Sequence, residues 1–106
     1  MRRDPLHIEP RRVKLPSVLS FGRLQPDKWL LLKTLEEAAE LVEAGKQAVN
    51  APDFQAGLNA RADMLSEWAD VLQTLVNTAV AFNFTDMEIE QAMHDCLERN
   101  RLKGRV

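Results

Sequence analysis

QPDKWLLLKTLEEAAELVEAGKQAVN, residues 25–50, carries the clearest structural pattern in the chain. Apolar and small residues recur in it at spacings of three and four, at Leu31, Leu35, Ala38, Val42 and Gly45. This spacing predicts an amphipathic helix. Pro26 and Asp27 suit the first turn of that helix. Because Pro52 disfavours helix at the residue before it, the helix should end near Asn50.

Two further helices are predicted from similar patterns. Residues 60–83, ARADMLSEWADVLQTLVNTAVAFN, carry one apolar stripe at Leu65, Trp68, Leu72, Leu75, Val76 and Ala79. Residues 51–59 fit either a loop or a short helical turn. Thr85 and Glu88 form a capping-box signature, which predicts a third helix that ends near Gly104. Because no alternating β-pattern occurs, we expect an all-α fold, an antiparallel helical bundle completed by dimerisation.

Length and composition indicate one small domain. The chain has 106 residues, 45% hydrophobic and 28% charged, with a net charge of −2, which is ordinary for soluble globular proteins. No apolar run approaches the roughly 18 residues of a membrane span, and the N-terminus lacks the apolar region of a secretory signal. The single cysteine, Cys96, excludes an internal disulfide. We therefore expect a cytoplasmic protein that does not contact a membrane.

Residues 1–24 differ from the rest of the chain. They hold three of the five prolines, and six basic side chains against two acidic ones. We therefore divide the chain into a basic, proline-containing arm, residues 1–24, and a helical domain, residues 25–106. The arm could contact nucleic acid or an acidic surface of the same or a neighbouring subunit. Because no interleaved aromatic residues and no known binding motif accompany the charge, nucleic acid is not the expected partner.

Five carboxylates stand at helical spacing in the first two predicted helices. Glu36, Glu37 and Glu40 lie within about one turn of each other, and Glu67 and Asp70 are three residues apart. On a helical wheel the second pair flanks the apolar stripe, so antiparallel packing can bring the two groups together. Such a group is unfavourable without a cation, and oxygen-only ligands suit Mg²⁺ or Mn²⁺. The alternative is that both groups are simply solvated.

This acidic pattern resembles that of a known family. Glu36-Glu37-x-x-Glu40, followed after 26 residues by Glu67-x-x-Asp70, is similar to the EExxE…ExxD pattern of the MazG-like all-α nucleoside triphosphate pyrophosphohydrolases. The segments LEEAAELVEA, residues 35–44, and EWADVLQTLVN, residues 67–77, look like the same family. The ending LERNRLKGRV, residues 97–106, is similar to the Asn-Arg-x-x-Gly-Arg ending of many small members. The resemblance covers residues 27–105.

The resemblance implies a fold, an assembly and a reaction. The fold is one of packed antiparallel helices, and the assembly is a homodimer or a dimer of dimers. The reaction is Mg²⁺-dependent hydrolysis of an NTP or dNTP between its α- and β-phosphates. By position, Glu37, Glu40, Glu67 and Asp70 are the implied metal ligands. Glu36 is implied beside Glu37 as a catalytic carboxylate, either a second-metal ligand or the group that orients the attacking water.

Several polar residues are candidates for binding the substrate. Asn77 follows Asp70 by two turns on nearly the same face, and is interpreted either as a contact to a phosphate or sugar or as a polar surface residue. Asn100, Arg101 and Lys103 crowd the end of the third helix. Cations are favoured there by the helix dipole, and they also suit a triphosphate.

Two other functions remain open at this point. One is phosphoribosyl-ATP pyrophosphohydrolase, a related helical enzyme of histidine synthesis. The other is a non-catalytic helical interaction or nucleic-acid-binding module that uses the basic arm for its contacts. An enzyme site should gain thermal stability from Mg²⁺, whereas a plain binding module should not.

Overall fold

The computed structural model describes residues 9–106, so the first eight residues of the predicted arm lie outside the described residues. The described chain forms α1 (Lys28–Val49), α2 (Phe54–Ala81) and α3 (Asp86–Leu102), with no strand. The prediction of an all-α chain is confirmed. None of these three helices combines the length and the apolar character that crossing a membrane requires. The described residues divide into two compact units: one is Val18–Phe84, and the other comprises residues 9–17 and Thr85–Val106.

Capping side chains set where each helix begins. Asp27 and Asp53 cap α1 and α2, and each accepts a hydrogen bond from a backbone N–H three residues later. Thr85 Oγ1 accepts from Glu88 N at 3.1 Å, and Glu88 Oε1 accepts from Thr85 N at 2.9 Å, which confirms the predicted capping box. The cap at Asp53 makes residues 54–59 part of α2, where the sequence left a loop or a short turn open.

The predicted helix ends also agree with the structure. Helix α1 ends at Val49 with Asn50 as its C-cap. Helix α3 ends at Leu102, and Gly104 follows with a φ of 72°. Glycine adopts this left-handed conformation without the steric penalty of a Cβ atom, which explains why it stands just past the helix end.

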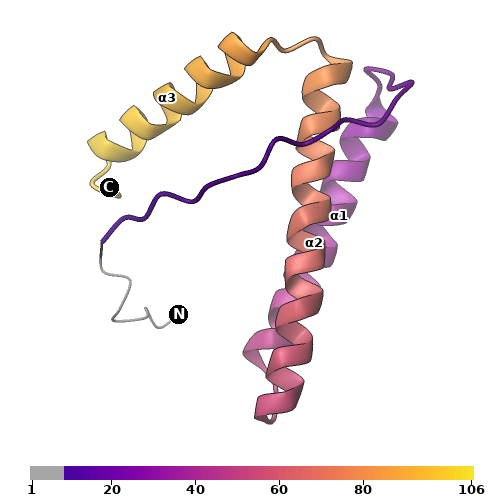
Figure 1. Cartoon of the computed structure of the whole chain (residues 1–106), viewed down its shortest axis with the longest axis vertical. Helices are drawn as coiled ribbons and strands as arrows, with labels where there is room; N and C mark the ends of the chain where they lie inside the picture. Colours follow the sequence, from indigo (N-terminus) through magenta and orange to yellow (C-terminus); the bar gives the residue numbers. More distant parts are fainter. Residues whose placement is uncertain (1–8) are drawn as a thin grey trace. The chain divides into compact units, whose positions relative to one another are not determined.

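Helices α1 and α2 form an antiparallel hairpin and pack side by side (Figure 1). The buried and half-buried residues of α1 form one stripe: Leu30, Thr34, Glu37, Ala38, Leu41, Ala44, Gly45 and Ala48. Many of these residues are small, which lets the helices approach closely. A Cβ atom added to Gly45 would lie 3.6 Å from Met64 Cε of α2. The stripe includes a glutamate, so the contact between the helices carries a charged group.

The large apolar residues of the predicted stripes are mostly exposed in the single chain. On α1 these are Leu31, Leu35 and Val42, and on α2 they are Leu65, Trp68 and Leu75. Leu35, for example, is 66% exposed. Helix α1 has apolar residues around most of its circumference, and its smaller residues occupy the contact with α2. A large apolar surface is therefore left on the hairpin.

Candidate functional site

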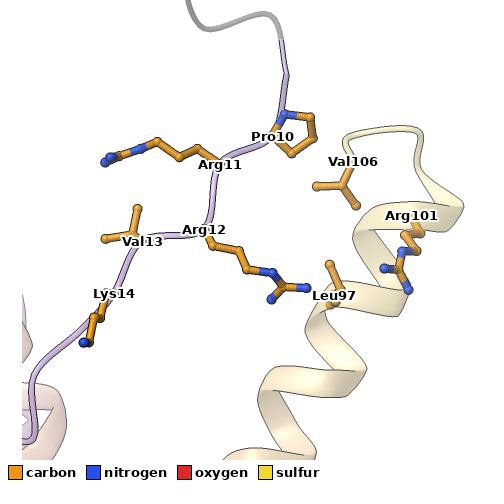
Figure 2. A pocket seen from close by; sticks show the side chains of 8 residues that line it. All are labelled: Pro10, Arg11, Arg12, Val13, Lys14, Leu97, Arg101 and Val106. Carbon is orange, nitrogen blue, oxygen red and sulfur yellow. The ribbon is translucent and has the colours of Figure 1, made fainter.

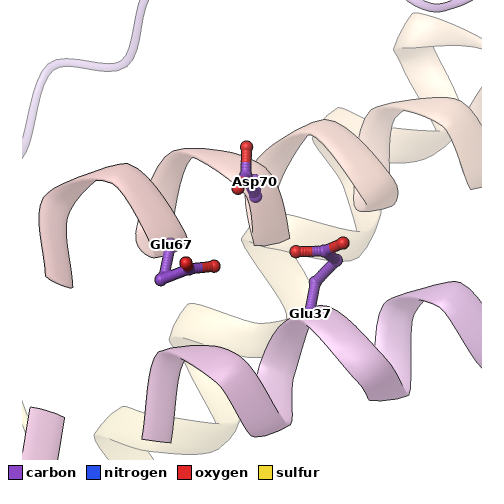
Figure 3. A group of neighbouring side chains, drawn as sticks. All are labelled: Glu37, Glu67 and Asp70. Atoms are coloured by element: carbon purple, nitrogen blue, oxygen red, sulfur yellow. The ribbon is translucent and has the colours of Figure 1, made fainter. Parts of the chain in front are cut away.

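The hairpin brings together three of the carboxylates singled out in the sequence. Glu37 of α1 faces Glu67 and Asp70 of α2, as Figure 3 shows. One carboxylate oxygen from each lies within 4.8 Å of one another. Glu67 and Asp70 stand one turn apart on α2, and Glu37 reaches them because α1 packs antiparallel to α2. The convergence expected from spacing is thus present for these three residues.

Burial makes this cluster different from an ordinary exposed acidic patch. Glu37 is only 9% exposed. Among the described residues, three buried side-chain oxygens have no hydrogen-bond partner, namely Thr34 Oγ1, Glu37 Oε2 and Glu67 Oε2. A buried polar atom without a partner costs about 1–3 kcal/mol, and more when it is charged. Two of these three oxygens belong to the cluster, one on Glu37 and one on Glu67.

A single ammonium group lies against the cluster. Lys33 Nζ lies 3.3 Å from Glu37 Oε1, an i,i+4 pair, and 3.3 Å from Glu36 Oε2, an i,i+3 pair. The hydrogen bonds to Glu37 and then to Glu36 raise the pKa of Lys33 above its ordinary value. One positive charge does not balance three or four carboxylates. The site therefore keeps a negative charge that a further cation would neutralise.

The remaining acidic residues of the motif lie at the edge of this cluster. Glu36 is exposed and pairs with Lys33. Glu40 is exposed and does not belong to the group of three. It instead lines, with Glu43 and Glu67, a shallow hollow of ≈ 360 Å³ beside the cluster. Glu40 and Glu67 thus line the same hollow, and Glu40 lies one turn along α1 from Glu37.

The donor set indicates which ion would fit. The three clustered side chains offer carboxylate oxygens only, and hard cations such as Mg²⁺ and Mn²⁺ prefer these ligands. Zn²⁺ sites usually include cysteine or histidine, and neither belongs to the cluster. The unpartnered oxygens of Glu37 and Glu67 are the atoms that a cation would satisfy first. The residues present therefore fit a hard divalent cation.

Asn77 has a structural position that the sequence did not indicate. It is only 3% exposed, so the interpretation as a polar surface residue is wrong. Its Oδ1 accepts hydrogen bonds from Phe21 N at 3.0 Å and from Gln73 Nε2 at 3.1 Å. Gln73 Nε2 also donates to the Leu19 carbonyl at 2.9 Å. Asn77 and Gln73 thus fasten the segment around residues 19–21 to α2, and a contact from Asn77 to substrate stays a prediction.

The candidate residues near the C-terminus belong to the other compact unit. Asn100 Oδ1 accepts from Arg105 Nη1 at 3.1 Å. Arg101 Nη1 pairs with Glu98 Oε1 at 2.6 Å, and Lys103 is the C-cap of α3. Asn100 and Arg101 thus make side-chain contacts within their own unit, and Lys103 caps α3 through its backbone. Their proposed contacts to a triphosphate stay predictions.

Sequence reasoning missed Thr34 and Gln73. Thr34 precedes Glu37 by one turn on the same face, so its hydroxyl shares the contact with α2. Gln73 precedes Asn77 by four residues, a spacing at which two amide side chains meet on a helix.

Comparisons of the chain with protein-family models, with curated proteins and with solved structures found no match. The likeness to MazG-like enzymes therefore rests on the motif residues alone.

Proposed function

We propose that this protein is a Mg²⁺-dependent nucleoside triphosphate pyrophosphohydrolase. The observation that carries the proposal is the convergence of Glu37, Glu67 and Asp70 within 4.8 Å, with buried, unpartnered oxygens on two of them. Such an arrangement is costly unless a cation completes it. The resemblance of the motif to MazG-like enzymes supplies the reaction, cleavage between the α- and β-phosphates to a nucleoside monophosphate and pyrophosphate.

The roles of the side chains follow from their exposure. Glu37 and Glu67 would hold the ion from the buried side, Asp70 from the exposed side, and Glu40 from the adjoining hollow. A bound Mg²⁺ would supply positive charge for the phosphates and lower the pKa of a water. Glu36 Oε2 is occupied by Lys33, which leaves Oε1 to accept a proton from the attacking water. Solvent-facing Asp70 and Glu36 mark the side from which a triphosphate would approach.

The proposal includes assembly as a homodimer or dimer of dimers. Its support is the apolar surface of the hairpin, where Leu35 and Trp68 remain 66% and 44% exposed. Exposed apolar patches of this kind usually mark an interface. Sedimentation equilibrium should find a dimer or tetramer, and Leu35→Glu should shift the population toward monomer. A wild-type monomer at all concentrations would exclude this assembly.

The decisive assay is release of pyrophosphate from a panel of ribo- and deoxyribonucleoside triphosphates with Mg²⁺ or Mn²⁺. At least one should yield pyrophosphate and the monophosphate, and EDTA should abolish the reaction. Glu40→Gln and Asp70→Asn should each remove activity without loss of helicity. Glu90→Gln is the matched control, because Glu90 is exposed on α3 and lies outside both the motif and the hollow.

Two rival functions are tested by the same material. Phosphoribosyl-ATP joins the panel, and its exclusive turnover would assign the enzyme of histidine synthesis instead. A non-catalytic module would turn over none of the nucleotides. It would also gain no thermal stability from Mg²⁺, since no folded-state site would bind the ion.

A further inference from the structure

A groove with a positively charged lining, unlike the acidic cluster of the hairpin, lies within the unit that comprises residues 9–17 of the arm and α3. Its volume is ≈ 740 Å³. Four of its lining residues are cationic, namely Arg11, Arg12, Lys14 and Arg101, and none is acidic. The chain as a whole has a net charge of −2, so a groove lined by cations alone is a local departure from its average. The lining favours an anionic ligand.

The two arginines nearest the centre of the groove come from opposite walls. In Figure 2 the side chain of Arg12 extends from the arm toward Leu97, and Arg101 lies beside Leu97 on α3. Arg11 and Lys14 point away from α3. Arg101 pairs with Glu98 through Nη1 only, and both partners are about half exposed. A guanidinium has five N–H donors, so Arg101 retains donors for a ligand.

The rest of the groove is apolar. Pro10 and Val13 of the arm, Leu97 of α3 and Val106 provide this surface. An inorganic anion would use the arginines and leave the apolar wall in contact with water. A purely apolar ligand would leave the guanidinium groups without partners. The combination suits a molecule with one anionic end and one apolar end.

We propose that this groove binds a phosphate ester with an apolar or aromatic body, such as a nucleotide. The phosphate lies between Arg12 and Arg101, whose planar guanidinium groups match phosphate oxygens. The body of the ligand lies against Leu97 and Val106. A volume of ≈ 740 Å³ falls within the range of small-molecule sites. No aromatic residue lines the groove, so the stacking platform of single-stranded nucleic-acid sites is absent from this lining.

This site shares Arg101 with the residues predicted to contact the triphosphate substrate, but it uses neither the carboxylate cluster nor a cation bound there. Its residues belong to the arm and α3, whereas Glu37, Glu67 and Asp70 belong to the α1–α2 hairpin. Binding in the groove therefore requires neither Mg²⁺ nor the carboxylates. Titrations in EDTA separate the two sites, because the carboxylate cluster without a metal repels a triphosphate.

Isothermal titration calorimetry of the full chain in EDTA at low salt tests the proposal, with ATP and inorganic triphosphate as probes. ATP should bind at one site per chain, and several-fold more tightly than triphosphate. Arg12→Gln and Arg101→Gln should each weaken ATP binding about tenfold, the effect of losing one charge-assisted hydrogen bond. Arg61→Gln, an exposed arginine of α2, and Asp70→Asn should leave it unchanged.

Three results would overturn the proposal. The first is absence of ATP binding in EDTA, and the second is unaltered affinity in Arg12→Gln. The third is a single-stranded oligonucleotide that binds while ATP does not, which would assign the groove to nucleic acid. Leu97→Ala separates the two halves of the site, since it should weaken ATP but not triphosphate. Circular dichroism of each variant checks that α3 is intact.

Discussion

The carboxylate cluster makes a prediction in which a stability change depends on the metal. In Glu67→Gln, one of three mutually close negative charges is removed from the α1–α2 contact. Two unit charges at the upper limit of 4.8 Å that holds within the cluster repel by about 0.9 kcal/mol at a dielectric constant of about 80 and about 3.5 kcal/mol at about 20. The pair with exposed Asp70 lies near the lower value, and the pair with buried Glu37 lies higher. We therefore expect the metal-free variant to be more stable than wild type by about 1–3 kcal/mol.

Saturating Mg²⁺ should cancel or reverse this difference. A ligand at about a hundred times its Kd stabilises the folded state by about 2.7 kcal/mol. Wild type should receive this stabilisation and Glu67→Gln should not, because the variant lacks a ligand. Urea unfolding in EDTA and in saturating Mg²⁺ measures both effects. The matched control is Glu90→Gln on α3, an exposed glutamate that should change stability by less than about 0.5 kcal/mol in either buffer. The reasoning is refuted if Glu67→Gln is destabilised in EDTA, or if Mg²⁺ stabilises both proteins equally.

Three further predictions concern the surroundings of the site and the helix ends. Lys33→Met should lower stability in EDTA yet increase Mg²⁺ affinity several-fold in calorimetry, because the ammonium competes with the ion for Glu37; equal or weaker affinity would contradict this. Asn77→Ala should cost about 1–3 kcal/mol in urea unfolding, because Phe21 N–H loses its buried acceptor, whereas Asn59→Ala, an exposed control, should change little. Thr85→Ala should cost α3 about 1 kcal/mol. The backbone and side-chain hydrogen bonds of Thr85 lower the pKa of exposed Glu88, so the separate contribution of the Glu88 carboxylate to the capping box is present above the ordinary carboxyl pKa and is lost as pH falls through the lowered value. Circular dichroism should show that loss in wild type and not in Glu88→Gln.

Local signals in the sequence predicted the helix ends well. Thr85 and Glu88 specify a capping box through contacts within four residues, so no knowledge of the fold was needed to place the start of α3. The start of α2 could not be placed from the sequence, because Pro52 lies just before its first turn and Gly57 lies within that turn. The structure shows that the cap at Asp53 outweighs the low helix propensity of one glycine.

Which face of α1 packs on α2 could not be read from periodicity. Apolar residues cover much of the helix, so several stripes satisfy a spacing of three and four. The stripe that packs on α2 contains Glu37 and several small residues, whereas Leu31 and Leu35 are exposed. The i,i+3 spacing and an antiparallel hairpin allow Glu37 to meet Glu67 and Asp70, as the sequence analysis expected, but they do not select the face of α1 that makes this contact. The burial of Asn77 was not predictable, since it depends on residues 19–21, which are more than fifty positions away.

Glu37 lies at a position where an apolar residue would give the hairpin more stability. A leucine at this place would bury apolar surface against α2 and would stabilise the fold by about 1.5–3 kcal/mol. The chain instead has a carboxylate that is 9% exposed, with one oxygen lacking a partner. Large apolar residues such as Leu35 and Trp68 meanwhile remain on the surface. A hairpin arranged only for its own stability would exchange these positions. The observed arrangement becomes favourable when a cation binds the carboxylates and a second subunit covers the apolar residues, and both conditions belong to the proposed enzyme.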